Sequence, residues 1–339
     1  MAARPTVRDV ARVAGVSHAT VSRHLNGHTN VAPETSARIV AAIAEVGFVP
    51  NGNARSLVRR RSHNVAFVVR EHIDMFYADP TLSRMAAGAN ARLAKAGYLM
   101  PLLIVDTADT VDRVVEMIRG GTVDGAILVA MRRDDPLVRA LRGTSTPVVT
   151  ASAPLEDEGL TWVDTDNQGG TFTITELLLQ TGRTRIAALC GPIEAPVTHL
   201  RYAGLTEALG RQPEPSLVAY AHEWSYEAGA AAMAQILEAG TIPDGVVAAS
   251  DLLAAGAMSV LAERGLRVPE DVAIVGFDDS PMANMTTPPL TTVRQDSRRT
   301  GDEMAALILE RIESDTAAGA HITVPSTVVW RESAGPHPG

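Results

Sequence analysis

Side chains that can contact DNA bases stand at helical spacing near the start of this 339-residue chain. Residues 17–25 predict a short helix whose buried side contains Val21 and Leu25, one turn apart. Arginine can donate to O6 and N7 of guanine together, and short polar neighbours let a helix enter the major groove. The outward residues are His18, Ala19, Ser22 and Arg23. This face therefore offers recognition of double-stranded DNA.

A preceding helix and a tight turn would hold that face in place. Thr6 and Asp9 have capping-box spacing, which predicts a helix start, and Gly15 tolerates the positive φ of a turn. Ser17 can then cap the second helix. The buried stripe of the first helix would be Val10, Ala11 and Ala14. The same spacings also fit an ordinary helical hairpin with a solvated outer face, because glycine turns between amphipathic helices are common.

A third helix is expected from Pro33 to about Gly47. Ala32 stands where a serine would make a stronger cap. The apolar residues of this helix include Ile39, Val40 and Ile43. The basic run at 59–61 is either solvated linker or a phosphate contact.

The charge of the chain is divided unevenly. The net charge is −9, yet residues 1–61 hold nine arginines against three acidic residues, a net of +6. The remainder therefore carries −15. A basic module joined to an acidic body is typical of a protein that binds nucleic acid at one end.

Composition and missing motifs exclude several classes of protein. No run of about 18 apolar residues predicts a transmembrane helix, and the amino terminus has no signal-peptide core, so we expect a cytoplasmic protein. Cys190, the single cysteine, excludes an intramolecular disulfide and is expected to be a packing thiol. No nucleophile elbow, Walker loop, HExxH or CxxC pair is present. We therefore expect neither an enzyme nor a cofactor or metal site.

From Asn64 onward, apolar strands alternate with amphipathic helices. This pattern predicts parallel sheets covered on both faces. The length exceeds one typical domain, so we expect an α/β core of two doubly wound parallel-sheet units. Candidate strands span 65–69, 98–105, 125–130, 148–151, 186–190, 217–221, 246–249 and 272–277. Candidate helices span about 81–96, 109–119, 134–142, 168–181, 199–210, 225–239 and 252–265.

Polar residues stand where these strands end. Open parallel sheets bind ligands beyond the carboxyl ends of their strands, and carboxylates can bond the vicinal hydroxyls of a polyol. The residues at these positions are Ser152, Asp164, Ser250, Asp251, Asp278 and Asp279. Asp251 could instead only cap its helix, and Asp279 could be a turn residue.

Short motifs follow one another in a recognisable order. The first run reads DVA at 9–11, AGVS at 14–17, TVSR at 20–23 and LN at 25–26. Later motifs are VGFVPN at 46–51, ARSL at 54–57, GP at 191–192, GFDD at 276–279 and PPLTTVRQ at 288–295. Over nearly the whole chain, this order resembles the LacI/GalR family of bacterial transcription regulators.

The resemblance implies how the amino-terminal segment contacts DNA. Base-reading positions would be Val7, His18, Ala19, Ser22 and Arg23. Phosphate-contacting positions would be Thr6, Ser17, Thr20, Asn26, Asn30, Thr35 and Asn51. Arg55 and Leu57 match the hinge, where Leu57 would wedge into the minor groove and bend the duplex. A leucine packed on the core is the alternative.

The resemblance also extends the predicted effector site. An indole can cover the apolar face of a sugar ring, and arginine can bond its hydroxyls. The effector residues would be Ser152, Asp164, Arg201, Trp224, Ser250, Asp278 and Gln295. The sequence departs from the family pattern at Ser152, Val197 and Ser250, so a sugar is expected while nucleobases and other small metabolites stay open.

Function and organisation follow from the resemblance. It implies a sequence-specific transcriptional regulator, a repressor, that binds a palindromic operator as a homodimer under the control of a small ligand. We expect a helix-turn-helix domain at 1–50, a hinge helix and linker at 51–61, and an effector-binding and dimerisation core at 62–339. The core would be periplasmic-binding-protein-like, with subdomains at about 62–163 plus 296–322 and about 164–292 plus 323–331. The alternative is a solute-binding module of the transport-receptor type. Both induction and corepression fit the sequence.

Overall fold

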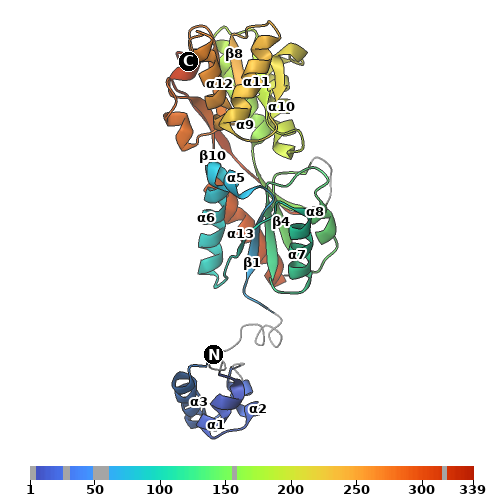
Figure 1. Cartoon of the computed structure of the whole chain (residues 1–339), viewed down its shortest axis with the longest axis vertical. Coiled ribbons are helices and arrows are strands. Elements are labelled where there is room, and N and C mark those ends of the chain that lie inside the picture. Colours follow the sequence, from blue (N-terminus) through green and yellow to red (C-terminus); the bar gives the residue numbers. More distant parts are fainter. Residues whose placement is uncertain (1–4, 26–30, 49–60, 155–158, 315–318) are drawn as a thin grey trace.

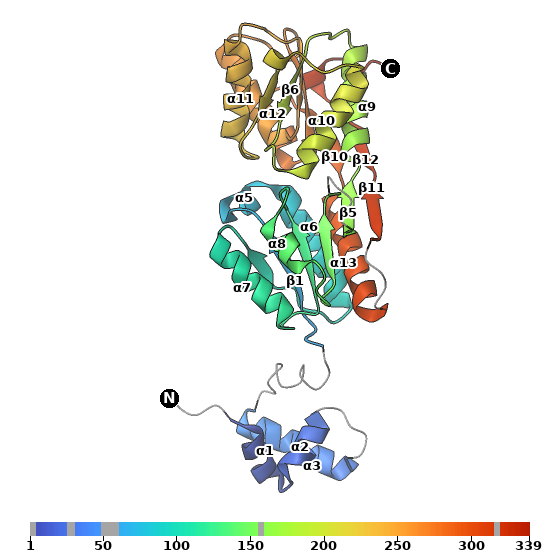
Figure 2. The same ribbon diagram turned by 90° about the vertical axis from the view of Figure 1, so that its right-hand side faces the viewer.

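The computed structural model describes residues 5–25, 31–48, 61–154, 159–314 and 319–339. A small helical bundle forms the amino-terminal end, and two α/β lobes are stacked along the long axis of the core (Figures 1 and 2). Among the described residues, no helix has both the length and the apolar character needed to cross a bilayer.

The amino-terminal bundle consists of α1 (Val7–Ala14), α2 (His18–Leu25) and α3 (Pro33–Val46). The predicted capping box is confirmed, since Asp9 Oδ2 accepts from the Thr6 amide at 2.9 Å and the Thr6 hydroxyl at 2.8 Å. Gly15 has φ +64°, and Ser17 caps α2 through the Thr20 amide at 3.1 Å. The buried core includes Val10, Ala11, Ala14, Val21 and Ile39.

One residue of the third helix departs from the expected stripe. Val40 is 56% exposed, because it is rotated by about 100° from the buried Ile39. Ala32 precedes the helix without making a side-chain cap, as its chemistry predicts.

The core contains two six-stranded sheets, which confirms the predicted α/β class with parallel sheets. The first has the order β11-β5-β4-β3-β1-β2, with β1 Val65–Val69, β2 Leu102–Ile104, β3 Gly125–Val129, β4 Val148–Ala151, β5 Thr161–Thr165 and β11 His321–Val324. The second has the order β12-β10-β9-β8-β6-β7, with β6 Ile186–Cys190, β7 Val218–Tyr220, β8 Gly245–Ala248, β9 Ala273–Asp278, β10 Thr291–Gln295 and β12 Ser326–Val329. Among the strands in the described part of the chain, only β12 runs antiparallel to its neighbour.

Helices cover both faces of each sheet. In the first lobe, α6 (Pro80–Lys95) and α13 (Ser297–Ser314) pack on one face, and α7 (Ala108–Arg119) and α8 (Pro136–Leu141) on the other. In the second lobe, α11 (Tyr226–Glu238) and α12 (Asp251–Glu263) pack opposite α9 (Asn167–Gln180) and α10 (Pro196–Leu209). A short helix, α5 (Ile73–Ala78), follows β1.

Glycines let two of these helix pairs approach closely. A Cβ atom at Gly88 of α6 would overlap the Arg298 carbonyl oxygen of α13, and one at Gly256 of α12 would overlap the Tyr226 carbonyl oxygen of α11. The paired helices therefore meet backbone against backbone, which leaves little freedom for either to shift within its lobe.

Several predicted elements were wrong or incomplete. Residues 323–331, assigned above to the second subdomain, do not belong to it as a whole: β11 lies in the first sheet and β12 in the second, separated by Pro325. Of the strand expected at 98–105, 102–104 form β2 and Leu99 makes an isolated parallel bridge with Asn64. Pro101 lies between them and has no amide hydrogen to donate. The elements α5, β5, β10 and α13 were not predicted.

Within the described residues, the chain crosses between the lobes three times: after β5, after β10, and between β11 and β12. Two crossovers are bonded to each other, because the Asp166 amide donates to the Val324 carbonyl at 2.9 Å and the Ser326 hydroxyl donates to the Asp166 carbonyl at 3.1 Å. These contacts tie the end of β5 to the start of β12.

A carboxylate ties together three segments of the second lobe. Asp279, directly after β9, accepts from Arg294 Nε of β10 and from Arg331 Nη2 beyond β12, both at 2.6 Å. Burial raises the pKa of Asp279, but the hydrogen bonds from Arg331 and Arg294 lower it further, so that it lies below the usual value.

We predict that Asp279→Asn lowers the free energy of unfolding by about 2–4 kcal/mol, because two guanidinium groups lose their carboxylate. The loss is full at neutral pH. It shrinks as the pH falls through the low folded-state pKa of Asp279, where the wild-type carboxylate is also protonated. Urea unfolding followed by circular dichroism measures the free energy of unfolding of both proteins at each pH. The control is Asp271→Asn, which removes a surface pair with Arg267; equal losses in the two variants would contradict the assignment.

Candidate functional site

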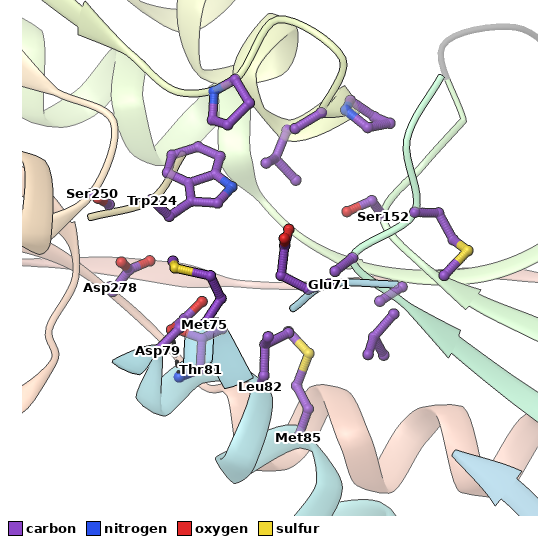
Figure 3. Close-up of a pocket in the computed structure, with 18 of the residues that line it drawn as sticks. Glu71, Met75, Asp79, Thr81, Leu82, Met85, Ser152, Trp224, Ser250 and Asp278 are labelled. Carbon is purple, nitrogen blue, oxygen red and sulfur yellow. Dashed lines mark hydrogen bonds between the residues drawn. The ribbon is translucent and has the colours of Figure 1, made fainter. Parts of the chain in front are cut away.

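A cavity of about 250 Å³ lies between the two lobes, where strands of both sheets end (Figure 3). The structure brings all the predicted effector residues to its wall: Ser152, Asp164, Arg201, Trp224, Ser250, Asp278 and Gln295. Asp164 lies within β5, not after a strand as expected. Val197 also lines the cavity.

Asp251 and Asp279, which were also predicted at strand ends, lie outside the cavity wall. Asp251, the first residue of α12, is fully buried and accepts from the Ser280 amide at 2.7 Å and the Thr292 hydroxyl at 2.5 Å. Burial raises the pKa of Asp251 to about 7. Its bonds hold the turn that follows β9, so Asp251 supports the backbone behind Asp278.

Arg201 is the buried cation of the site. It extends from α10, is 7% exposed, and donates from Nε to Asn167 Oδ1 at 2.8 Å and from Nη1 to the Ala249 carbonyl. Its guanidinium lies 3.7 Å from the centroid of the Phe277 ring, and Asp278 Oδ1 is 3.8 Å away. Burial lowers the pKa of Arg201 and Asp278 raises it, and the group stays charged at neutral pH because its ordinary pKa is so high.

Two carboxylates lie deep in the wall. Asp278 ends β9 with φ +123°, and its Oδ1 accepts from Gln295 Nε2 at 2.6 Å. Burial raises the pKa of Asp278 well above its usual value, against the opposing effect of Arg201. Burial also raises the pKa of Asp164 to about 6, although the amides of Ala153 and Thr165 donate to its two oxygens. Such shifts are common where a protein recognises a polar ligand.

Apolar side chains form opposite walls of one part of the cavity. Figure 3 shows Trp224 on one side and Met75, Leu82 and Met85 on the other. A Cβ atom at Gly191 would overlap the indole, so this glycine makes room for Trp224 at the end of β6. An indole facing methionine and leucine, beside carboxylates and a guanidinium, suits a ligand with an apolar ring face and hydroxyls at its edge.

A backbone contact joins the lobes beside the cavity. The Arg133 amide, in the loop after β3, donates to the Glu194 carbonyl, in the loop after β6, at 2.8 Å. Ser250 caps α12 through the Leu253 amide at 3.2 Å, and Ser152 follows β4 with φ +76°. Strand ends of both lobes are thus fixed around the same space.

The amino-terminal bundle presents a second candidate surface. His18, Ala19 and Arg23 are exposed on α2, Ser22 is half-buried, and Arg23 Nε donates to the Ala19 carbonyl at 3.3 Å. This places three predicted base-reading residues on one accessible face.

The other predicted DNA contacts are placed less uniformly. Val7 packs partly against the bundle core. Thr6 is exposed in its capping box, the Ser17 and Thr20 hydroxyls bond each other at 2.8 Å, and Thr35 is half-buried. Asn26, Asn30, Asn51, Arg55 and Leu57 lie outside the described residues.

Comparison with known proteins is consistent along the chain. Residues 6–51 match the model for bacterial regulatory proteins of the lacI family, and residues 175–334 match a periplasmic binding protein-like domain. The HTH-type transcriptional regulator CelR of Thermobifida fusca is 38% identical over 97% of this chain and 98% of that protein. The chain belongs to the LacI family of bacterial regulators. The transcriptional repressor CytR of Escherichia coli K12 is 33% identical over 91% of this chain and 90% of that protein.

Solved structures of LacI-family proteins share the whole fold. A complex of CelR with cellobiose superposes with a TM-score of 0.77 at 37% identity, covering 97% of this chain and all of that one. The lac repressor dimer bound to operator and the anti-inducer ONPF superposes with a TM-score of 0.83 at 26% identity, covering 98% of this chain and all of that one. The predicted family, the DNA-binding regulatory class and the expectation that this is not an enzyme are confirmed.

This LacI-family cavity has lining residues that sequence analysis missed. Glu71 follows β1, so the strand-end rule could have found it. Asp79 caps α6 through the Thr81 amide at 2.8 Å and reaches the cavity from a helix pair without a clear sequence signal. Asn167 begins α9 and bonds both Asp164 and Arg201. No group of three potential ligands that could hold a metal occurs among the described residues.

We predict that Gly191→Ala displaces the Trp224 indole and weakens ligand binding in the cavity, because a methyl group would occupy space that the ring now fills. The tryptophan fluorescence emission should shift in this variant. The Trp224→Phe variant shows which part of the emission comes from Trp224. Cys190→Ala, which removes a buried sulfur from the preceding residue, is the control. An unchanged spectrum in Gly191→Ala would show that the indole does not depend on this glycine.

Proposed function

We propose that this LacI-family regulator is a repressor that binds a palindromic operator as a homodimer, and that a sugar bound between its lobes changes its affinity for DNA. The observation that carries the proposal is the cavity, where an indole, a buried guanidinium and carboxylates meet at the strand ends of both lobes. This set of groups suits a polyol with one apolar face. The cellobiose complex of CelR extends the proposal to gluco-oligosaccharides.

The dimer and the palindrome are proposed together. Leu102 in the edge strand β2 is 42% exposed, and Leu99, which precedes this strand, is 73% exposed. An uncovered apolar edge favours association. Two copies related by a two-fold axis would present two α2 faces to half-sites of opposite orientation. The lac repressor, a LacI-family relative, is a dimer on its operator.

Coupling between sugar and DNA would use the connection between the lobes. Groups from both lobes line the cavity, so a ligand that contacts both favours one relative orientation over others. We propose that residues 51–61 form the hinge that reads this orientation and that Leu57 wedges into the minor groove, as the sequence motif suggests. A regulator of chromosomal DNA would act in the cytoplasm.

The test begins with selection of bound duplexes from a random library by the purified full-length protein. The winning duplex is then titrated in the presence of cellobiose, other sugars and nucleobases. We expect a palindromic winner whose affinity changes with a sugar. Enrichment of a non-palindromic site would contradict the proposed homodimer. A change of DNA affinity with nucleobases alone would contradict the proposed sugar effector.

We predict that Arg23→Ala weakens binding to the selected operator by about 10- to 100-fold, because one guanine contact is worth about 1–3 kcal/mol. Binding to unrelated DNA should change much less, since it rests on phosphate contacts. Fluorescence anisotropy at fixed salt measures both affinities. The control is Arg113→Ala, which removes an exposed arginine from α7 of the core. Equal losses on operator and unrelated DNA would remove Arg23 from base recognition.

A further inference from the structure

We infer that the cavity between the lobes selects uncharged and ammonium-bearing sugars and rejects sugar phosphates and sugar acids. This inference rests on the proposed sugar-binding function and narrows its ligand class. It follows from an inventory of the charged groups that line the cavity and of the partners each group already has.

Every basic side chain in the wall already faces a carboxylate. Arg201 Nη1 lies 3.8 Å from Asp278, Arg132 Nη2 lies 3.5 Å from Glu71, and His222 Nε2 lies 3.8 Å from Glu223. Each arginine in the wall is therefore already opposed by an acidic side chain before a ligand arrives.

Other carboxylates in the wall have no such counterpart. Asp79, Asp164 and Glu194 line the cavity, and none of them has a basic group within 4.0 Å among the described residues. Both oxygens of Asp164 accept bonds from the protein, whereas the partners of Asp79 come from one residue, the Thr81 amide and hydroxyl. Asp79 thus keeps acceptor capacity for a ligand.

Arg201 is poorly placed to bind an anion. A phosphate or carboxylate is usually held by two parallel N–H groups of an arginine. In this structure Nε donates to Asn167 and Nη1 donates to the Ala249 carbonyl, while one face of the guanidinium covers the Phe277 ring. The group instead fixes Asn167 and faces Asp278.

An anionic ligand would lose its hydration beside an excess of carboxylates. Like charges at close range raise the free energy of the complex, and the low polarity of the walls near Trp224 and Met85 strengthens that repulsion. Burial raises the pKa of Asp79, and an ammonium group that exchanged its hydration water for this side chain would favour the ionised carboxylate. A neutral sugar is neither repelled nor attracted by the carboxylates as a charge. It is held by hydrogen bonds to its hydroxyls and by contact with the indole.

The test uses three β-1,4-linked disaccharides of different charge: cellobiose, which is neutral, its C6 carboxylic acid, which is anionic, and the glucosamine dimer, in which amino groups replace the C2 hydroxyls. Calorimetric titration of the full-length protein at pH 7 gives the three affinities. We expect the acid to bind about tenfold or more weakly than cellobiose and the amine to bind at least as tightly. In Asp79→Asn the advantage of the amine should shrink, while in Asp74→Asn, an exposed carboxylate on α5, it should persist.

The outcomes separate this inference from the proposed function. Equal or tighter binding of the acid would overturn the charge selection while leaving a sugar-responsive regulator standing. An unchanged preference for the amine in Asp79→Asn would overturn the assignment to that carboxylate. If none of the three disaccharides binds while a nucleobase does, the sugar proposal fails, and the charge selection fails with it.

Discussion

The burial of one guanidinium is the constraint on which the cavity depends. A charge in the interior is tolerated only when its surroundings supply bonds and an opposite charge. For Arg201 these come from Asn167, the Ala249 carbonyl, Asp278 and the Phe277 ring. Asn167 directly follows the first crossover between the lobes. The contacts that stabilise the buried charge of Arg201 therefore also fix the position of this crossover.

The sequence could predict the fold class and much of the site, because apolar strands mark their own ends. Ser152, Ser250 and Asp278 follow or end such strands, and the structure places all three at the cavity. Arg201, Trp224 and Gln295 came only from family motifs, since no local pattern marks an arginine inside a helix as buried. Asp79 was missed because α5 is too short to show helical periodicity.

The unpredicted strands β5 and β10 share a physical cause. Both carry buried threonines, whose hydroxyls bond within the protein: Thr165 to Gln295, and Thr292 to Asp251. A search for continuous apolar runs passes over such strands. Both strands lie next to the crossovers, where polar side chains connect one lobe to the other. The apolar pattern therefore did not predict the strands that link the two sheets.

The three crossovers have a mechanical consequence. All three are linked by hydrogen bonds, because Thr165 Oγ1 donates to Gln295 Oε1 at 3.1 Å and Asp166 bonds both Val324 and Ser326. Three linked connections oppose sliding and separation of the lobes more than rotation about the line that they form. Helices that meet backbone against backbone make each lobe stiff, so little of the turning is absorbed inside it. In such a rotation, the displacement of an atom grows with its distance from the line of crossovers. A small rotation at the cavity therefore becomes a larger displacement at the far end of the first lobe, on the side of the amino-terminal bundle (Figure 2).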